Sequence, residues 1–344
     1  MKLGIGLGYA GATLHLPIER IQRAEALGYD AVWTSESYSS DALTPLAFIA
    51  AHTKKIKLAT NVVQLAARTA ANLAMCAQTI DAMAGGNRVI VGIGVSGPQI
   101  VEGWYGEPWG RPNYRIRDYV AIVRRIFRRD APVAYEGKEI SLPWRGPGST
   151  GLGKPLKNIM HGNPDIPIFL GTATDLNIRM TAEIADGWLP NARWPGFMKV
   201  YGPIIDEGLA RRTDGRTRKD FQIQGGVAVS VGNDVKTALD ALKPHTALYV
   251  GGMGARNKNF HYDTMVKRGY PEAAARIQEL FLAGRKDEAA AAVPDEYIDE
   301  GSLVGPPARI RERWKPWLDS GYTGVTIGNP TDEVLELMAG LPRG

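Results

Sequence analysis

The stretch RVIVGIGVSGPQIVEGWYG, residues 88–106, decides the expected fold because it joins an apolar strand to a glycine-rich turn. Its Val and Ile residues are typical of a strand that is buried on both faces. The glycines of the turn allow a ligand to approach the backbone closely, and Pro98 suits the first turn of a helix. The stretch therefore predicts a binding loop at the end of a buried strand.

The turn also contains a G-x-G-x-x-G triplet in residues 92–97, with Asp118 about 20 residues further on, as in dinucleotide-binding loops. A second copy lies in residues 6–11, but Pro17 would break the helix that this copy should open. A chain with 40 glycines produces such triplets by chance. The triplets alone do not identify a dinucleotide site.

Around this stretch, patterns of buried strands alternate with patterns of amphipathic helices. The segment AEALGYDAVWTSE (24–36) also has an echo in WLDSGYTGVTIGN (317–329), which suggests repeated units. We expect eight strands, at about residues 3–8, 30–34, 56–62, 88–93, 166–170, 186–190, 223–229 and 323–327. The sequence predicts an α/β fold, a (β/α)8 TIM-type barrel formed by residues 1–344 as a single domain, with insertions after strands 4 and 7.

The two insertions are expected at about residues 105–166 and 251–307. The first contains a basic helix, RIRDYVAIVRRIFRRD (115–130), and a predicted hairpin, PVAYEGKEISL (132–142). The arginines of this helix alternate with apolar residues at helical spacing, which favours a solvated helix face over a nucleic-acid site. The second insertion contains Ala-rich helices, interpreted as a lid or an oligomer contact.

Composition narrows the class of protein. With 44% hydrophobic residues and a net charge of +5, the chain is typical of a globular protein that favours an anionic ligand. The single cysteine, Cys76, rules out an intramolecular disulfide framework and favours the cytoplasm. No apolar run is long enough to span a membrane, and the scattered histidines predict no metal site. We expect neither a nucleic-acid nor a membrane partner.

Three segments carry a family resemblance: residues 32–87, residues 92–106 and PIFLGTATDLNIRMTAEIADGWLPN (167–191). Together they resemble the luciferase-like monooxygenase superfamily, and its branch of F420-dependent oxidoreductases most closely. The resemblance implies coenzyme F420 at the C-terminal ends of the strands, with FMN as the alternative cofactor. It implies hydride transfer between the deazaflavin C5 and a small organic substrate. An FMN-dependent monooxygenase with a separate reductase and a non-catalytic flavin-fold binding protein are the alternatives.

Matching the motifs of this family places the cofactor-binding residues after strands 2, 3, 4 and 5. They are Ser35, Glu36 and Ser37 near the ring, Asn61 and Val62 in a strand-3 bulge behind the ring, Ser96 and Gly97 after strand 4, and Gly171, Thr172, Ala173 and Thr174 at the cofactor phosphate. The resemblance also implies a non-proline cis peptide between Asn61 and Val62. The helix that begins near Asp175 would direct its positive end at the phosphate.

The sequence departs from the sugar-phosphate dehydrogenases of this branch, which have a His and a Glu where this chain has Ser37 and Pro98. A sugar-phosphate substrate is therefore not expected. Glu36 and Glu102 are the candidates for a catalytic proton donor. Candidates for the substrate side are Tyr9, His15 and Tyr38.

The resemblance further implies a homodimer or a larger homo-oligomer. The second and third predicted helices carry more apolar residues than one buried face requires, at Leu46, Phe48, Ile49, Leu73 and Met75. The alternative is that the insertions cover these residues.

Overall fold

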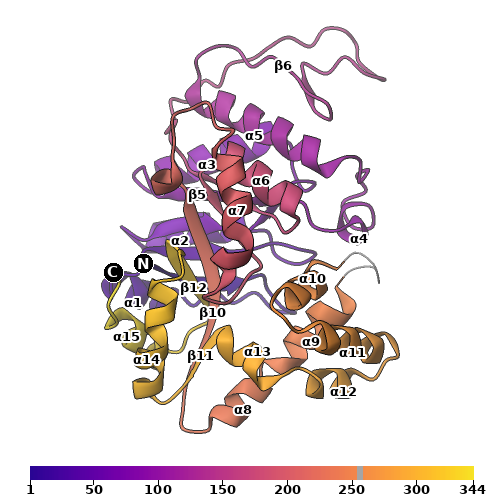
Figure 1. Cartoon of the computed structure of the whole chain (residues 1–344). Helices are drawn as coiled ribbons and strands as arrows, with labels where there is room; N and C mark the ends of the chain where they lie inside the picture. Colours follow the sequence, from indigo (N-terminus) through magenta and orange to yellow (C-terminus); the bar gives the residue numbers. More distant parts are fainter. Residues whose placement is uncertain (254–258) are drawn as a thin grey trace.

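The computed structural model describes residues 1–253 and 259–344, which form a closed barrel of parallel strands inside a ring of helices (Figure 1). The barrel strands are β1 (Lys2–Gly8), β2 (Ala31–Thr34), β3 (Lys57–Thr60) with its continuation β4 (Val63–Gln64), β5 (Val89–Gly94), β8 (Ile168–Gly171), β9 (Gly187–Trp188), β10 (Gln222–Val231) and β12 (Gly324–Gly328). Each of the eight strands predicted from the sequence is present.

Adjacent strands pair in the order β1, β2, β3, β5, β8, β9, β10, β12, and every pairing is parallel. The barrel closes where β12 pairs with β1, with Lys2 opposite Gly324 and Gly6 opposite Gly328. One further strand, β11 (Ser302–Gly305), pairs in parallel with the end of β10. The predicted TIM-type barrel is confirmed.

The helices follow the alternation expected from the sequence. They are α1 (Ile18–Ala26), α2 (Leu43–His52), α3 (Ala70–Met83), α4 (Pro98–Val101), α5 (Pro112–Arg128), α6 (Asp175–Ile184), α7 (Phe197–Leu209), α8 (Val235–Asp240), α9 (Lys243–Gly252), α10 (Phe260–Lys267), α11 (Pro271–Leu282), α12 (Lys286–Ala291), α13 (Asp295–Glu300), α14 (Pro307–Leu318) and α15 (Asp332–Ala339). Within the described residues, no helix is both long enough and apolar enough to cross a membrane.

Side chains that start the helices satisfy backbone N–H groups that would otherwise have no partner. Thr69 accepts a hydrogen bond from Asn72 N at the start of α3, and Thr331 caps α15 in the same way. Asp41 accepts from the N–H groups of residues 43 and 44 at the start of α2. Asp41 therefore supplies the side-chain acceptor at the start of α2.

The two faces of the barrel sheet pack into separate cores. Residues that face the helices, such as Val32, Leu58 and Ile168, join the large core between strands and helices. Their neighbours Trp33 and Phe169 point the other way and form a small cluster that fills the barrel interior. This filled interior supports the loops at the C-terminal ends of the strands.

The first predicted insertion contains the hairpin expected from the sequence, formed by β6 (Tyr135–Glu136) and β7 (Ser141–Leu142). The basic helix of this segment is α5, which packs against α3 and α6 as one of the ring helices. Its apolar residues are buried, including Ile116, Val123 and Phe127.

The helices α8 to α13 form a second, smaller core beside the barrel, drawn in orange in Figure 1. Buried residues of this core include Val250, Met265 and Ile277. The cluster starts with α8, before the position expected for the second insertion, and ends at β11, which pairs with β10.

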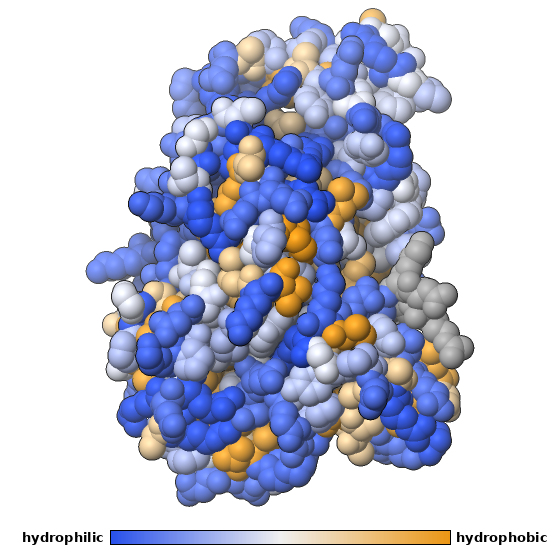
Figure 2. Space-filling view, viewed as in Figure 1, coloured by the Kyte–Doolittle hydropathy of each residue, from blue (hydrophilic) through white to orange (hydrophobic). Residues whose placement is uncertain are grey.

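Of the five apolar residues proposed to face a dimer partner, Leu46, Ile49 and Leu73 are buried within the chain. Phe48 and Met75 remain exposed, at 52% and 57%. On the face shown in Figure 2, apolar side chains form small groups among hydrophilic ones. The buried residues give no support to a dimer interface, and the oligomeric state stays a prediction.

Candidate active site

The predicted cofactor-binding residues follow β2, β3, β5 and β8, which are consecutive strands of the closed barrel. Because all barrel strands are parallel, these residues lie at the same end of the barrel. Direct pairings connect them: Gly94 lies opposite Gly171, and Gln64 lies opposite Gly94. Glu36 N donates to Val62 O at 3.3 Å. The structure thus brings the residues of four separate motifs together.

The bulge between β3 and β4 has the predicted backbone geometry, because the Asn61–Val62 peptide bond is cis. The Val62 side chain lies against two glycines of neighbouring strands. A Cβ on Gly94 would lie 2.5 Å from Val62 Cγ2, and a Cβ on Gly171 would lie 2.9 Å from Val62 Cγ1. Glycine is therefore required at both positions by the bulge itself, whatever ligand the site binds.

Glu36 lies inside the loop region, with its side chain only 2% exposed. Arg68 donates to both of its carboxylate oxygens at 2.8 Å. Gln64 N donates to one of these oxygens at 2.6 Å, and Ala42 N donates to the other at 3.1 Å. Burial opposes the charge of Arg68, but its hydrogen bonds with Glu36 outweigh this effect and raise the pKa of the guanidinium.

These contacts occupy both carboxylate oxygens of Glu36 and tie the loop after β2 to β4. A buried and fully bonded carboxylate is poorly placed to give a proton to a substrate. The geometry therefore favours a structural role for Glu36 over the proton-donor role considered from the sequence. Next to it, the side-chain oxygen of Gln64 is buried without a hydrogen-bond partner among the described residues. This oxygen is a free acceptor at the barrel mouth.

The other proton-donor candidate, Glu102, is exposed at the end of α4, and its side chain makes no hydrogen bond with the described residues. Nearby, Tyr38 and Trp104 pack edge to face with ring centroids 6.4 Å apart. Tyr105 Oη donates to Ser37 O at 3.0 Å, which joins the loops after β2 and β5. Ser96 adopts a left-handed backbone conformation with φ 59°, at the turn that leads into Gly97 and α4.

The loop after β8 contains the residues expected to bind the cofactor phosphate. Thr172 is buried, and its hydroxyl bonds with the hydroxyl of Thr181 at 2.8 Å. Its side chain is thus committed to the protein interior and does not fit the expected role of a phosphate donor. Thr174 caps α6 by accepting from Asn177 N at 3.3 Å. The backbone N–H groups of Ala173 and Thr174 have no hydrogen-bond partner among the described residues.

A cavity of about 410 Å³ lies between this loop and helix α10. Tyr201 and Lys267 line it together with Ala173 and Thr174. Lys267 Nζ lies 2.7 Å from Asp175 Oδ1 and 5.3 Å from the centre of the Tyr201 ring. The negative charge of Asp175 would be unfavourable beside a phosphate, and its pairing with Lys267 reduces this effect. The ammonium of Lys267 and the two free N–H groups suit an anionic group.

A further aromatic group lies on α9 and α10, where the Tyr249 ring packs against two histidine rings. The centroid distances are 4.4 Å to His245 and 4.6 Å to His261. Burial lowers the pKa of His261 to about 4, helped by repulsion from Arg193 and His245. Burial raises the pKa of Tyr9, and the nearby Tyr249 adds to this effect. This aromatic group therefore lies beside Tyr9, in the loop after β1.

Sequence reasoning missed Lys267, Arg193 and this histidine pair. His245 and His261 are 16 positions apart in the chain, and only the packing of α9 against α10 brings them to one tyrosine. His15, predicted for the substrate side, is exposed. In the described part of the chain, no three His, Cys, Asp or Glu side chains form a group that could hold a metal ion.

The fold and this end of the barrel define a (β/α)8-barrel protein with a ligand site built from the loops that follow its strands. The model of the luciferase-like monooxygenase family matches residues 2–324, and the chain belongs to this enzyme family.

Relatives cover nearly the whole chain. It is 43% identical over 342 residues to "Putative coenzyme F420-dependent oxidoreductase" of Mycobacterium tuberculosis, with 98% of both chains covered. It is 28% identical over 317 residues to 5,10-methylenetetrahydromethanopterin reductase of Archaeoglobus fulgidus, covering 90% of this chain and 88% of that protein. The solved coenzyme F420-dependent tetrahydromethanopterin reductase of Methanopyrus kandleri superposes with a TM-score of 0.77 at 25% identity, covering 98% and 97% of the two chains.

Proposed function

We propose that this protein is an F420-dependent oxidoreductase that transfers a hydride between the deazaflavin C5 and an organic substrate. The family, and relatives named for coenzyme F420, support this assignment. The observation that carries it is the cavity beside the loop after β8, where Lys267 and two free backbone N–H groups meet. Coenzyme F420 carries a phosphate and glutamyl carboxylates, which Lys267 and the two N–H groups would bind, although Asp175 and Asp263 also line this cavity.

The residues at the strand ends fit the remaining parts of such a cofactor. When bound, the deazaflavin supplies or accepts the hydride, and the protein orients the reacting partners and excludes water. The bulge at Val62 would support the ring, and the Glu36–Arg68 pair would hold the neighbouring loops in place. The free oxygen of Gln64 would accept a hydrogen bond from a ligand N–H or O–H group. His261, held neutral by its burial, would line the substrate side.

A titration of the purified protein with F420 and, separately, with FMN tests this proposal. We expect saturable changes in the absorbance and fluorescence of F420 and a much weaker response with FMN. Tight FMN binding without a response to F420 would overturn the assignment and favour the monooxygenase alternative. Binding of F420 without turnover of any tested carbonyl or alcohol substrate would favour the non-catalytic binding protein.

We also propose that the protein acts in the cytoplasm as a homodimer that binds a small-molecule substrate, with residues 1–344 as one domain. Of the five apolar residues predicted for such a contact, Phe48 and Met75 are exposed. Analytical ultracentrifugation at micromolar concentration tests the assembly. A mass equal to that of the 37.4 kDa chain would contradict the dimer.

A further inference from the structure

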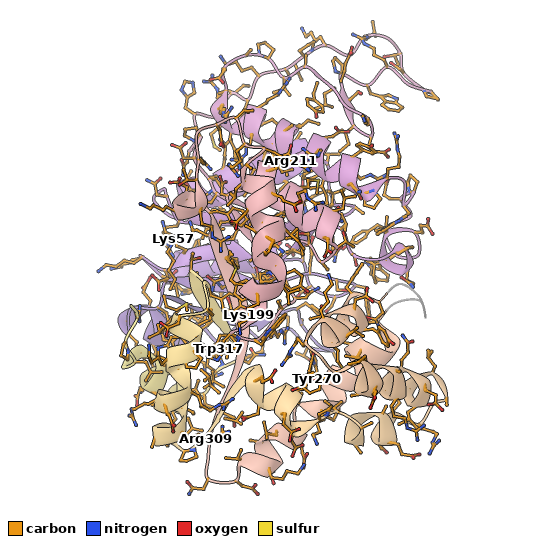
Figure 3. The ribbon with its side chains drawn as sticks, in the orientation of Figure 1. Lys57, Lys199, Arg211, Tyr270, Arg309 and Trp317 are labelled. Atoms are coloured by element: carbon orange, nitrogen blue, oxygen red, sulfur yellow. The ribbon has the colours of Figure 1, made fainter. Side chains whose placement is uncertain are left out.

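Five arginines line a cavity of about 280 Å³ at the N-terminal end of the barrel, opposite the candidate active site. Arg124 and Arg128 lie in the last turns of α5, and Arg211, Arg212 and Arg216 follow α7. The ring helices run antiparallel to the strands, so their C-terminal ends meet where the next strands begin. Figure 3 shows Arg211 at the end of α7 that lies beside α5.

Three of these arginines have partners within the protein. Asp186 pairs with Arg124 at 2.8 Å and also with Arg216, while Asp214 pairs with Arg212 at 2.7 Å. Arg212 also donates to two backbone carbonyl oxygens near the end of α6, at 2.9 Å and 2.7 Å. These contacts neutralise acidic side chains and a helix C-terminus, and they need no ligand.

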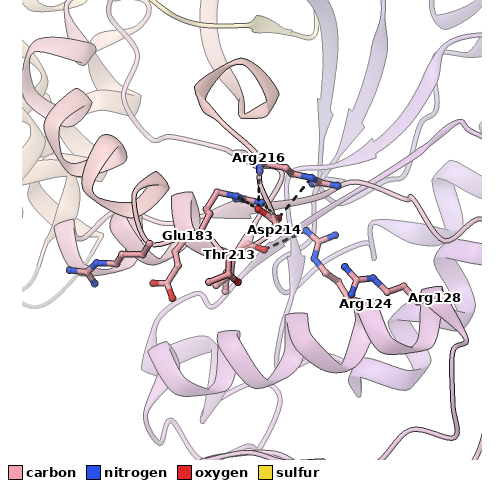
Figure 4. A pocket seen from close by; sticks show the side chains of 9 residues that line it. Arg124, Arg128, Glu183, Thr213, Asp214 and Arg216 are labelled. Atoms are coloured by element: carbon pink, nitrogen blue, oxygen red, sulfur yellow. Dashed lines mark hydrogen bonds and ion pairs between the residues drawn. The ribbon is translucent and has the colours of Figure 1, made fainter.

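The other two arginines have no such explanation. Arg128 and Arg211 are exposed, and neither side chain makes a hydrogen bond or an ion pair with the described residues. The remaining acidic residue of the cavity, Glu183, is bonded by Arg117 at 2.6 Å and 2.8 Å from outside it. Figure 4 shows Arg124 and Arg128 projecting from one helix toward the segment with Asp214 and Arg216.

Positive charge is therefore crowded in this cavity. Burial lowers the pKa of Arg124 to about 10, and repulsion from Arg128 and Arg212 contributes to this shift. Like charges held this close repel one another, and a bound anion would remove the repulsion. The planar guanidinium fork suits the oxygens of a phosphoryl group, which can accept from several arginines at once.

We propose that this cavity is a second anion site, separate from the cofactor site, that binds a phosphoryl group, either as inorganic phosphate or as a phosphate monoester. Arg128 and Arg211 are the two residues whose side-chain N–H groups make no hydrogen bond within the described residues, although Arg211 is close enough to Glu183 to help lower the pKa of that carboxyl. Arg124 and Arg212 also line the cavity, and their pairs with Asp186 and Asp214 fix their positions. The basic helix 115–130 thus contributes a binding surface at its C-terminal end, where the sequence suggested only a solvated face.

Calorimetric titration of the full chain with inorganic phosphate, with AMP and with succinate tests the proposal. Arg128→Ser combined with Arg211→Ser should weaken binding of phosphate and AMP at least about tenfold, because each variant removes hydrogen bonds to a charged group. Both residues are exposed and removing them relieves repulsion, so the double variant should unfold at the wild-type temperature or slightly above it. The matched control combines Arg311→Ser with Lys54→Ser, two exposed cations far from the cavity in the chain, and should change the affinity less than about twofold.

Phosphate could also bind at the loop after β8, and Lys267→Ala separates the two sites. Binding at the arginine cavity should persist in that variant. Unchanged phosphate affinity in the Arg128→Ser, Arg211→Ser protein would overturn the proposal, as would equal loss in the control. Succinate binding as tight as that of phosphate would overturn the phosphoryl assignment.

Discussion

Lys267 Nζ lies 2.7 Å from Asp175 Oδ1, so a helix of the second insertion contacts the first residue of the ring helix α6. The pair borders the cavity at the loop after β8. An exposed ion pair of this kind contributes about 0–1 kcal/mol to stability. Its main effect is to hold an ammonium group beside the free N–H groups of Ala173 and Thr174.

Replacing Lys267 should weaken cofactor binding. We expect Lys267→Ala to raise the Kd for F420 about tenfold, because one charge-assisted contact to the acidic tail is lost. Asp175→Asn should leave the Kd equal or lower, since it frees the same lysine. Lys199→Ala, which removes an exposed charge elsewhere, is the control. Fluorescence titration measures all three, and equal affinities for wild type and Lys267→Ala would refute the role of this lysine.

Removing the carboxylate of Glu36 should destabilise the fold. Glu36→Gln leaves the buried guanidinium of Arg68 without its bidentate partner, which should cost about 3 kcal/mol of the free energy of unfolding. Glu279→Gln breaks an exposed pair with Arg276 and should change the free energy of unfolding by less than about 0.5 kcal/mol. Urea denaturation compares the two. If both variants unfold at the same urea concentration, Glu36 is not the structural residue described above.

The packing of Val62 between two glycines predicts a specific rescue. Gly171→Ala should cost about 1–3 kcal/mol, because its methyl group would meet Val62 Cγ1 at 2.9 Å. Adding Val62→Ala should restore part of this loss. Gly11→Ala, whose methyl group would enter open space, serves as the control. Thermal denaturation of the single and double variants measures the coupling, and strictly additive losses would contradict the contact.

Stability should depend on pH through His261. Its pKa is lowered from 6.5 to about 4 in the folded chain, so between these values the unfolded chain binds a proton that the folded chain does not. The contribution of His261 to the free energy of unfolding is therefore complete above about pH 6.5 and is lost as the pH falls toward 4. The loss amounts to about 2 kcal/mol between pH 7.5 and pH 5.

His261→Phe keeps an aromatic ring against Tyr249 and removes the titrating group. Urea denaturation at several pH values should show a shallower acid loss in this variant than in the wild type. An NMR titration provides the direct check. A His261 resonance that titrates near 6.5 would contradict the buried, neutral state.

The alternation of apolar strands with amphipathic helices made the barrel predictable, because the spacing of apolar residues identifies each strand and each helix from its own segment of sequence. The residues at the strand ends were found by family resemblance, and so was the cis peptide after Asn61. Strand propensity alone would have predicted neither these residues nor the cis peptide, since Val62 suits an ordinary strand.

The remaining features depend on contacts between distant segments. Thr172 and Thr174 look equivalent in the sequence, but the turn after β8 directs Thr172 inward to Thr181 and leaves Thr174 at the helix start. Lys267 reaches the loop after β8 only because α10 folds back on the barrel. Glu36 was considered as an acid because its partner Arg68 is 32 positions away in the chain.

The helical cluster α8–α13 leaves the barrel after β10 and returns as β11, which pairs with the same strand. Its chain enters from β10 and continues from β11 through α14 into β12, so both of its connections lead to two adjacent strands of the barrel. The cluster also contacts the other side of the barrel, because Lys267 of α10 pairs with Asp175 at the start of α6. The cavity at the loop after β8 thus has one side from the barrel and one side from the second insertion, so a substitution in α10 can change a cavity that the barrel strands alone do not form.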